Sequence, residues 1–210
     1  MHKGLEVETP TFIDVFENAL DSDVCREIIH RFENDERNQF EGVVGNEQGE
    51  IGPGESKSCT ELSISGNHHW SDIDKVLFDA ITPVLHEQVE KYPGFGVGDG
   101  YEDEGYRIKR YLPNGQDKFT PHVDVNGCHS AHRQMVFMWY LNDVEEGGET
   151  FFPYHGFGVQ PREGRLVTFP PFWTHYHEGR MPISNTKYAV LGWFTFKILP
   201  PKNQIRVPLN

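Results

Sequence analysis

The stretch RQMVFMWYLN at residues 133–142 decides the fold, because it is a long aromatic and apolar run without helical periodicity. Three runs of the same kind accompany it: YRIKRYL (106–112), RLVTFP (165–170) and KYAVLGWFTFKIL (187–199). Clusters of Gly, Pro and Asn separate these runs, so they are typical of strands joined by turns without intervening helices. This half of the chain predicts an antiparallel sheet.

The first ninety residues show a helical pattern instead. Apolar residues recur at helical spacing over 24–32 and again over 73–85, although Pro83 should kink or split the second helix. Between them, residues 41–58 (EGVVGNEQGEIGPGESKS) are rich in Gly and polar residues, which predicts a long loop able to act as a lid. Helices followed by strands predict an α+β fold built on an antiparallel sandwich or barrel.

The length and charge of the chain limit the number of domains and the kinds of binding partner that it can have. Its 210 residues fit one domain with a substantial core. We expect residues 1–210 to form that domain, with helical support and the lid loop at 1–100, a strand-rich core that carries the site at 101–199 and a tail at 200–210. The formal net charge of −13 argues against binding of nucleic acid or an anionic membrane across the whole surface, but it is compatible with a locally basic cleft.

The cysteines and the first residues indicate the compartment. Cys25, Cys59 and Cys128 are widely spaced and form no C-x-x-C pair, which favours reduced thiols over a disulfide framework. The opening MHKGLEVETP lacks the apolar run of a secretory signal, and no window approaches the ~20 apolar residues of a membrane helix. We therefore expect a cytoplasmic protein.

Among the eleven histidines, His122 is distinguished by Asp124, which follows it two residues later. Residues i and i+2 of an extended segment point to the same face, so this imidazole and this carboxylate can bind one metal ion. A histidine from a distant strand would complete a two-histidine, one-carboxylate face that leaves open coordination positions on iron(II). The pair alone is weak evidence, and the third histidine is what gives it weight.

Several motifs, in one order, resemble the prolyl 4-hydroxylase-like branch of the iron(II)- and 2-oxoglutarate-dependent dioxygenases. The resemblance begins near Phe12 with FIDVFENALDSDVCREIIHRF and continues through RYLPNGQDKFTPHVD, RQMVFMWYLNDVEEGGETFFP and RLVTFPPFWTHYHEGRMPISNTKYAVLGWF. The string from Tyr-Leu-Asn-Asp to Gly-Gly-Glu-Thr and Phe-Pro is its most family-specific part. The resemblance covers nearly all of the chain except the Gly-rich loop and the tail. It implies a double-stranded β-helix, or jelly roll, with the N-terminal helices packed on it.

The resemblance also implies a set of site residues. Its three iron ligands would be His122, Asp124 and His177. Lys187 would pair with the distal carboxylate of 2-oxoglutarate through a charge-assisted contact. Tyr111 matches a tyrosine that hydrogen-bonds the co-substrate in relatives. Thr195 shares a strand face with Lys187 and is expected to add a hydroxyl group to the same site.

His175 is the alternative to His177 as the distal iron ligand. Counting back ten residues from Lys187 gives His177, whereas counting forward five from Phe169-Pro170 gives His175. We favour His177, because the turn from ligand to lysine is then tighter. His175 would in that case contact the ligand histidine or the substrate.

The function implied by the resemblance is hydroxylation of a C–H bond, most naturally in peptidyl proline, with consumption of O₂ and 2-oxoglutarate and release of succinate and CO₂. Ascorbate is expected as a reductant, and a proline-containing protein or peptide as the partner. One alternative is the same chemistry on a free amino acid or another small molecule. Another is a jelly-roll binding module that keeps its metal without turnover, but such a module would not need Lys187. The Gly147-Gly148 pair is expected to form a turn rather than to take part in catalysis.

Overall fold

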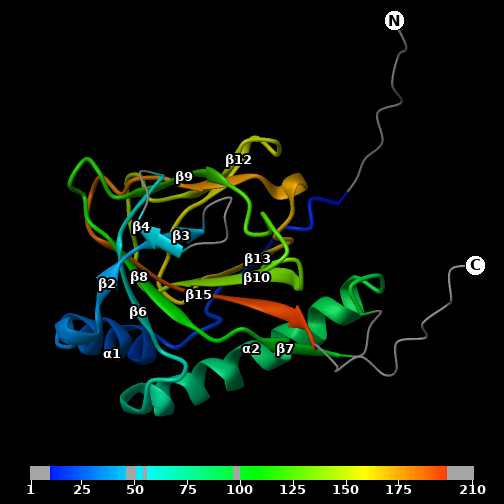
Figure 1. The fold of residues 1–210 in the computed structure, drawn as a ribbon, viewed down its shortest axis with the longest axis horizontal. Coiled ribbons are helices and arrows are strands. Elements are labelled where there is room, and N and C mark those ends of the chain that lie inside the picture. Colours follow the sequence, from blue (N-terminus) through cyan, green and yellow to red (C-terminus); the bar gives the residue numbers. More distant parts are fainter. Residues whose placement is uncertain (1–9, 46–50, 54–55, 97–99, 198–210) are drawn as a thin grey trace, which may run out of the picture.

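The computed structural model describes residues 10–45, 51–53, 56–96 and 100–197 (Figure 1). The elements of the N-terminal half are β1 (Asp14–Phe16), α1 (Ser22–Glu33), β2 (Phe40–Glu41), β3 (Val43–Gly45), β4 (Ile51–Pro53), β5 (Lys57–Ser58), β6 (Thr60–Ser63) and α2 (Ser71–Lys91). Those of the C-terminal half are β7 (Tyr101–Asp103), β8 (Arg107–Tyr111), β9 (Lys118–His122), β10 (Arg133–Tyr140), β11 (Thr150–Phe152), β12 (Phe157–Val159), β13 (Leu166–Phe169), β14 (His177–Gly179) and β15 (Lys187–Phe196). Short 3-10 turns lie at Glu36–Asn38, His68–Trp70 and Trp173–His175.

Two antiparallel sheets face each other across the interior. The larger has the strand order β1-β13-β10-β15-β8-β6-β2, with β7 pairing on β15, and the smaller has the order β12-β11-β14-β9-β5. In Figure 1, β9 and β12 lie in one layer, β10, β13 and β15 in the next, and α1 and α2 on the outer side of the larger sheet. This arrangement is the α+β, double-stranded β-helix expected from the sequence.

The central strand β10 shows why its sequence is apolar almost throughout. Side chains alternate between the two faces of a strand. Phe137 and Trp139 therefore pack in the cluster shared with the helices, whereas Val136, Met138 and Tyr140 face the smaller sheet. Because both faces are buried, the polar half of the usual alternation is missing.

Helix α2 continues from Ser71 to Lys91 through Pro83, so the expected split does not occur. A proline inside a helix costs about 3 kcal/mol. The buried stripe of this helix includes Ile73, Leu77 and Ile81. Each buried apolar side chain contributes about 1.5–3 kcal/mol, which outweighs that cost. Neither this helix nor any other in the described ranges combines the length and the apolarity needed to cross a bilayer.

Residues 1–100 contain the two expected helices α1 and α2, but the expected loop over 41–58 includes the short strands β3, β4 and β5. β6 pairs with β8 and β5 pairs with β9, so this region supplies strands to both sheets. The strands are two to four residues long, and the buried side chains of Lys57 and Glu61 are charged. Short strands with charged inner faces carry no alternation that a sequence pattern can detect. The expected lid at 46–50 and 54–55, and the tail at 200–210, lie outside the described residues.

Candidate metal centre and co-substrate pocket

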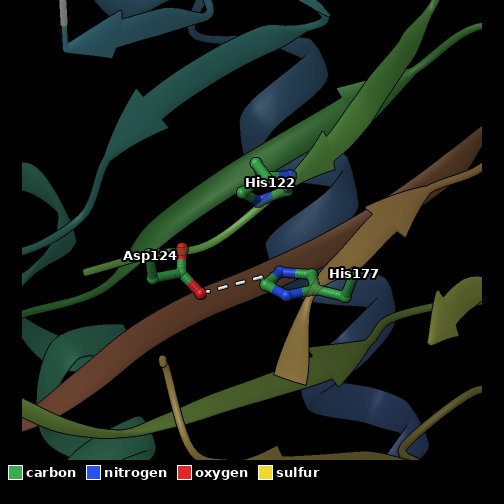
Figure 2. A group of neighbouring side chains, drawn as sticks. All are labelled: His122, Asp124 and His177. Carbon is green, nitrogen blue, oxygen red and sulfur yellow. Dashed lines mark ion pairs between the residues drawn. The ribbon is translucent and has the colours of Figure 1, made fainter. Parts of the chain in front are cut away.

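The side chains of two histidines in the smaller sheet and of Asp124, which follows β9, meet between the layers, and they are the three predicted iron ligands (Figure 2). His122 ends β9 and His177 begins β14, and the two residues are direct partners in the antiparallel register. Asp124 follows β9, where its backbone N–H donates to the Pro171 carbonyl at 3.1 Å. Ligand atoms of the three residues lie within 4.8 Å of one another. The group can therefore surround one metal ion.

Backbone carbonyls orient both imidazoles. His122 Nδ1 lies 2.8 Å from the Thr120 carbonyl oxygen, and His177 Nδ1 lies 2.9 Å from that of His175. A carbonyl only accepts hydrogen bonds, so each Nδ1 carries the proton and each Nε2 keeps its lone pair. Such bonds fix the ring orientation of histidines that bind metals. His177 Nε2 lies 3.6 Å from Asp124 Oδ2.

The electrostatics of the three residues suit a cation. Burial, reinforced by the neighbouring histidine, holds the pKa of His122 well below its usual value. Burial also lowers the pKa of His177, against the opposing effect of Asp124. Both rings are therefore neutral at pH 7, which is the state that binds metals. Among the described residues, the buried Oδ2 of Asp124 has no hydrogen-bond partner. Two imidazole nitrogens and a carboxylate oxygen are suitable donors for iron(II), so the residues fit that ion.

Aromatic side chains exclude water from one side of this centre. The Phe119 ring stacks on His122 with ring centroids 3.4 Å apart. Phe169 lies edge-on to His177 at 4.7 Å, and Phe152 lies 5.9 Å from the same ring. Electrostatic interactions are stronger in such a low-dielectric wall than in water.

The structure separates His175 from His177, which the sequence favours as the metal ligand. Residues Trp173–His175 form a 3-10 turn, so this stretch is not extended and the two side chains do not share a face. His175 Nε2 lies 2.8 Å from the Thr11 carbonyl oxygen, and its Nδ1 lies 2.8 Å from Thr174 Oγ1. Both ring nitrogens are thus occupied away from the metal centre. His175 instead orients His177 through its backbone carbonyl.

Lys187 lies where a co-substrate anchor is expected. It begins β15, is only 2% exposed and pairs in register with Tyr111 on β8. Its ammonium donates to the Gly148 carbonyl at 2.6 Å and lies 5.4 Å and 5.2 Å from the ring centroids of Tyr111 and Tyr140. Burial, with a contribution from Lys109, lowers the pKa of Lys187 to about 7. Lys187 and Tyr111 line one narrow cavity together with the three predicted iron ligands.

The Gly147-Gly148 turn supports this lysine. Both glycines have a positive φ, +74° and +75°. A Cβ on Gly147 would lie 2.4 Å from the Met181 carbonyl oxygen, so only glycine fits against the segment that joins β14 to β15. The Gly148 N–H donates to that same carbonyl at 2.9 Å, which leaves the Gly148 carbonyl to accept from Lys187. The turn has an architectural role, as expected.

The prediction for Thr195 is wrong. Its hydroxyl donates to the Glu102 carbonyl at 3.3 Å, and the residue lines neither the narrow cavity nor the larger one beside it. Thr195 is eight residues from Lys187 on one strand, which corresponds to about 26 Å at the rise of an extended chain. Alternation placed the two side chains on one face, but a shared face says nothing about distance along the strand.

Two further residues of the cavity did not emerge from the sequence. Lys109 is buried and lines both cavities, and it faces the same way as Tyr111 because it precedes that residue by two positions. That spacing was a usable signal. Thr150 lines the narrow cavity and accepts a hydrogen bond from the Tyr140 hydroxyl at 2.7 Å. Nothing in the sequence distinguished this threonine from others.

Sequence comparison matches the segment that carries this centre to a known family. Residues 106–195 match the model of the 2OG-Fe(II) oxygenase superfamily. The probable prolyl 4-hydroxylase 9 of Arabidopsis thaliana is 37% identical over 86 residues, which cover 31% of this chain and 29% of that protein. Procollagen-lysine,2-oxoglutarate 5-dioxygenase 1 of Gallus gallus is 29% identical over 123 residues, which cover 57% of this chain and 15% of that protein. The chain thus spans less than a third of the length of these curated relatives.

Solved structures share the fold. The viral collagen prolyl hydroxylase of Paramecium bursaria Chlorella virus-1, in complex with 2OG, has a TM-score of 0.63 at 19% identity and covers 89% of this chain and 97% of its own. A Trichoplax adhaerens prolyl hydroxylase, in complex with a hypoxia inducible factor peptide, has a TM-score of 0.70 at 15% identity and covers 88% and 84%. These likenesses confirm the predicted double-stranded β-helix. The segment 106–195, which carries the metal centre and Lys187, thus matches the 2OG-Fe(II) oxygenase superfamily, and the chain is similar to prolyl 4-hydroxylases in sequence and in fold.

Proposed function

We propose that this chain is an iron(II)- and 2-oxoglutarate-dependent dioxygenase that hydroxylates a C–H bond of a prolyl group and releases succinate and CO₂. The observation that carries the proposal is one cavity lined both by the two histidines and the aspartate and by a buried lysine. When bound, iron(II) would activate O₂ as the oxidant, and 2-oxoglutarate would supply two of the electrons for its reduction on conversion to succinate and CO₂.

The residues of the chain prepare the site for these groups. His122 and His177 present lone pairs because backbone carbonyls hold their Nδ1 protons. Lys187 is held on the Gly148 carbonyl with further N–H groups available for a carboxylate. Leu191 and Met138 add an apolar lining to the same cavity. This lining strengthens the contact between an ammonium and a carboxylate.

The substrate is proposed from the relatives and from the space beside the centre. The names of the similar proteins include prolyl hydroxylases, among them one solved with a bound peptide. A second cavity of about 470 Å³ adjoins the metal centre and shares His122 and Asp124 with the narrow cavity. This volume is within the range of ligand pockets and accommodates a prolyl group with its neighbours. A free amino acid or another small molecule is the second candidate.

The proposal extends to the working conditions of the enzyme. Ascorbate is proposed as the reductant that keeps the iron in its divalent state. A cytoplasmic location is proposed because Cys25, Cys59 and Cys128 are free thiols, which is typical of a reducing compartment.

Succinate formation tests the proposed reaction. Purified protein is incubated with Fe(II), ascorbate, 2-oxoglutarate and a panel of proline-containing peptides, and succinate and the mass gain of one oxygen atom are measured. Lys187→Ala serves as the control that lacks the proposed anchor. If succinate does not exceed the metal-free control with any peptide, the proposed reaction is refuted and the alternative, a binding module that keeps its metal without turnover, is favoured.

A further inference from the structure

The larger cavity has a positively charged wall, although the chain as a whole carries a formal charge of −13. Its cationic lining residues are Lys57, Arg107, Lys109 and Arg133. Its carboxylates are Glu104, which pairs with Arg133 at 2.5 Å, and Asp124, which is a predicted iron ligand. The three remaining cations are therefore not matched by a carboxylate of the lining itself.

The strand register explains how these cations come together. Arg107, Lys109 and Tyr111 alternate along β8, so all three point to the interior. Glu61 on β6 is the direct partner of Lys109 in the antiparallel register. Lys57, on the neighbouring β5, belongs to the smaller sheet and approaches the same point from the other side. The cluster thus bridges the two sheets at the level of the metal centre.

Among the residues that the structure describes, Glu61 is the one carboxylate that pairs with Lys57, Arg107 and Lys109. It is fully buried, forms an ion pair with Lys57 and lies 3.2 Å from Arg107 and 3.8 Å from Lys109. The surrounding cations hold its pKa below the usual value against the effect of burial, so Glu61 is ionised at neutral pH. Within the described residues, this one negative charge faces three positive charges, which leaves an excess of two positive charges.

Lys109 carries most of this imbalance. Its residue is only 6% exposed, and within the described part of the chain Glu61 at 3.8 Å is its one carboxylate partner. The Lys57 ammonium, by contrast, also donates a hydrogen bond to the Val43 carbonyl oxygen at 3.0 Å. A buried charge without a close partner is costly, so a site with this arrangement gains free energy when an anion enters.

This excess charge lies next to the reacting position. The ammonium groups of Lys57 and Lys109 lie 5.2 Å and 5.8 Å from the centroid of the Phe119 ring, and that ring stacks on His122. Lys109 also lines both cavities, as do His122 and Asp124. A small molecule whose anionic group binds the cluster can therefore reach the metal centre with its other end.

We infer that the substrate carries a carboxylate that binds Lys109 and Arg107 in the larger cavity while its reacting C–H bond faces the metal centre. The planar guanidinium of Arg107 matches a carboxylate, and its side chain is 37% exposed, so it lies toward the solvent side of the cluster. The inference rests on the proposed function and names its substrate class. The carboxylate belongs either to a free amino or imino acid or to a peptide whose own carboxylate adjoins the prolyl group.

The main rival occupant of the cluster is the carboxylate of 2-oxoglutarate that is nearer the iron. The lining residues separate the two cases. Arg107 and Lys57 line only the larger cavity, whereas Lys187 lines only the narrow one. A substitution of Arg107 should therefore weaken the binding of substrate and leave that of 2-oxoglutarate unchanged.

Matched acids and amides test the inference. Binding is measured by calorimetry on protein loaded with Mn(II) and 2-oxoglutarate, with L-proline against L-prolinamide and with a peptide ending in proline against its C-terminal amide. A third pair compares an amidated peptide with Glu beside the proline and the same peptide with Gln. Charge-assisted hydrogen bonds lead us to expect roughly ten- to a hundredfold tighter binding for the acid of at least one pair. The pair that discriminates identifies the source of the carboxylate.

Three variants complete the experiment. Arg107→Gln and Lys109→Met should remove the preference for the acid, whereas Lys75→Met, on the exposed face of α2, should retain it. If Lys109→Met fails to fold, the partly exposed Arg107→Gln still decides. Equal binding of acid and amide in every pair, no binding of any member, or a loss of 2-oxoglutarate affinity in Arg107→Gln would overturn the inference. Succinate formation without added substrate is measured separately, so that failure of the proposed function can be distinguished from failure of the carboxylate inference.

Discussion

The binding of 2-oxoglutarate should depend on pH through Lys187. Burial lowers the pKa of this ammonium from 10.5 to about 7 in the ligand-free protein, and Lys109 adds to the effect. This shift corresponds to a cost of roughly 5 kcal/mol for carrying the charge in the interior. A carboxylate bound to the ammonium favours the charged form and raises the pKa again. The complex therefore holds a proton that the free protein has lost above pH 7.

The sign and the size of the effect follow from this linkage. The affinity is fully present well below pH 7 and is lost as the pH rises through 7, because a smaller fraction of Lys187 is then protonated. With a pKa of about 7, that fraction falls from about one half at pH 7 to about 1% at pH 9, so the dissociation constant should rise about 50-fold. At pH 8, binding should take up about 0.9 proton per chain. His122 and His177 stay neutral over this range because their pKa values are lowered.

Calorimetry on Mn(II)-loaded protein, from pH 7 to pH 9 and in buffers of different ionisation enthalpy, measures both quantities. Lys187→Met keeps the length of the side chain but removes the charge, and it should bind 2-oxoglutarate weakly and with a smaller pH dependence, the remainder coming from Lys109, whose pKa burial lowers to about 8. A wild-type affinity that is constant over this range would refute the reasoning. The reasoning would also be refuted if the affinity of Lys187→Met fell with rising pH as steeply as that of the wild type, because the titrating group would then lie elsewhere.

Three further predictions concern the metal centre, the glycine turn and the buried carboxylate. His177→Ala should weaken Mn(II) binding at least ~100-fold, whereas His175→Ala should keep one metal per chain and lose roughly 1–3 kcal/mol of stability, as measured by metal titration and urea unfolding. Metal loss in His175→Ala alone would reverse the assignment. Gly147→Ala should destabilise the fold by more than Gly156→Ala, because both have a positive φ but only the former would place a Cβ against backbone atoms. Equal midpoints in urea would contradict this steric argument. Glu61→Gln should lower the free energy of unfolding by roughly 3 kcal/mol at pH 7, since it leaves buried cations unpaired. A variant as stable as the wild type would show that the cluster is solvated.

The strands of the core could be predicted because burial of their side chains requires apolar residues at most positions. RQMVFMWYLN is apolar at nearly every position since both faces of β10 are buried, and such a run is visible without any structure. The H-x-D pair was also visible, because its geometry depends only on two neighbouring residues of one extended segment. Local patterns of this kind survive in the sequence because their physical cause is local.

The choice between His175 and His177 required the tertiary structure. The backbone turns at Trp173–His175, and the His175 ring bonds to Thr11, which is far away in the chain. Spacing rules assume a backbone conformation, and they gave two conflicting answers where that conformation changes. Thr195 failed for a related reason, since alternation fixes the direction of a side chain but not its distance from the site.

By itself, the sequence determined the fold class, the motifs of the 2OG-Fe(II) oxygenase superfamily and the candidate residues His122, Asp124 and Lys187. Only the tertiary structure decided which histidine joins them and revealed the cluster of Lys57, Glu61 and Lys109. These three residues lie on short strands of two different sheets, and in the sequence their charges resemble those of a solvated loop. Their meeting depends on strand register across long chain separations, and register is set by the packing of the whole core.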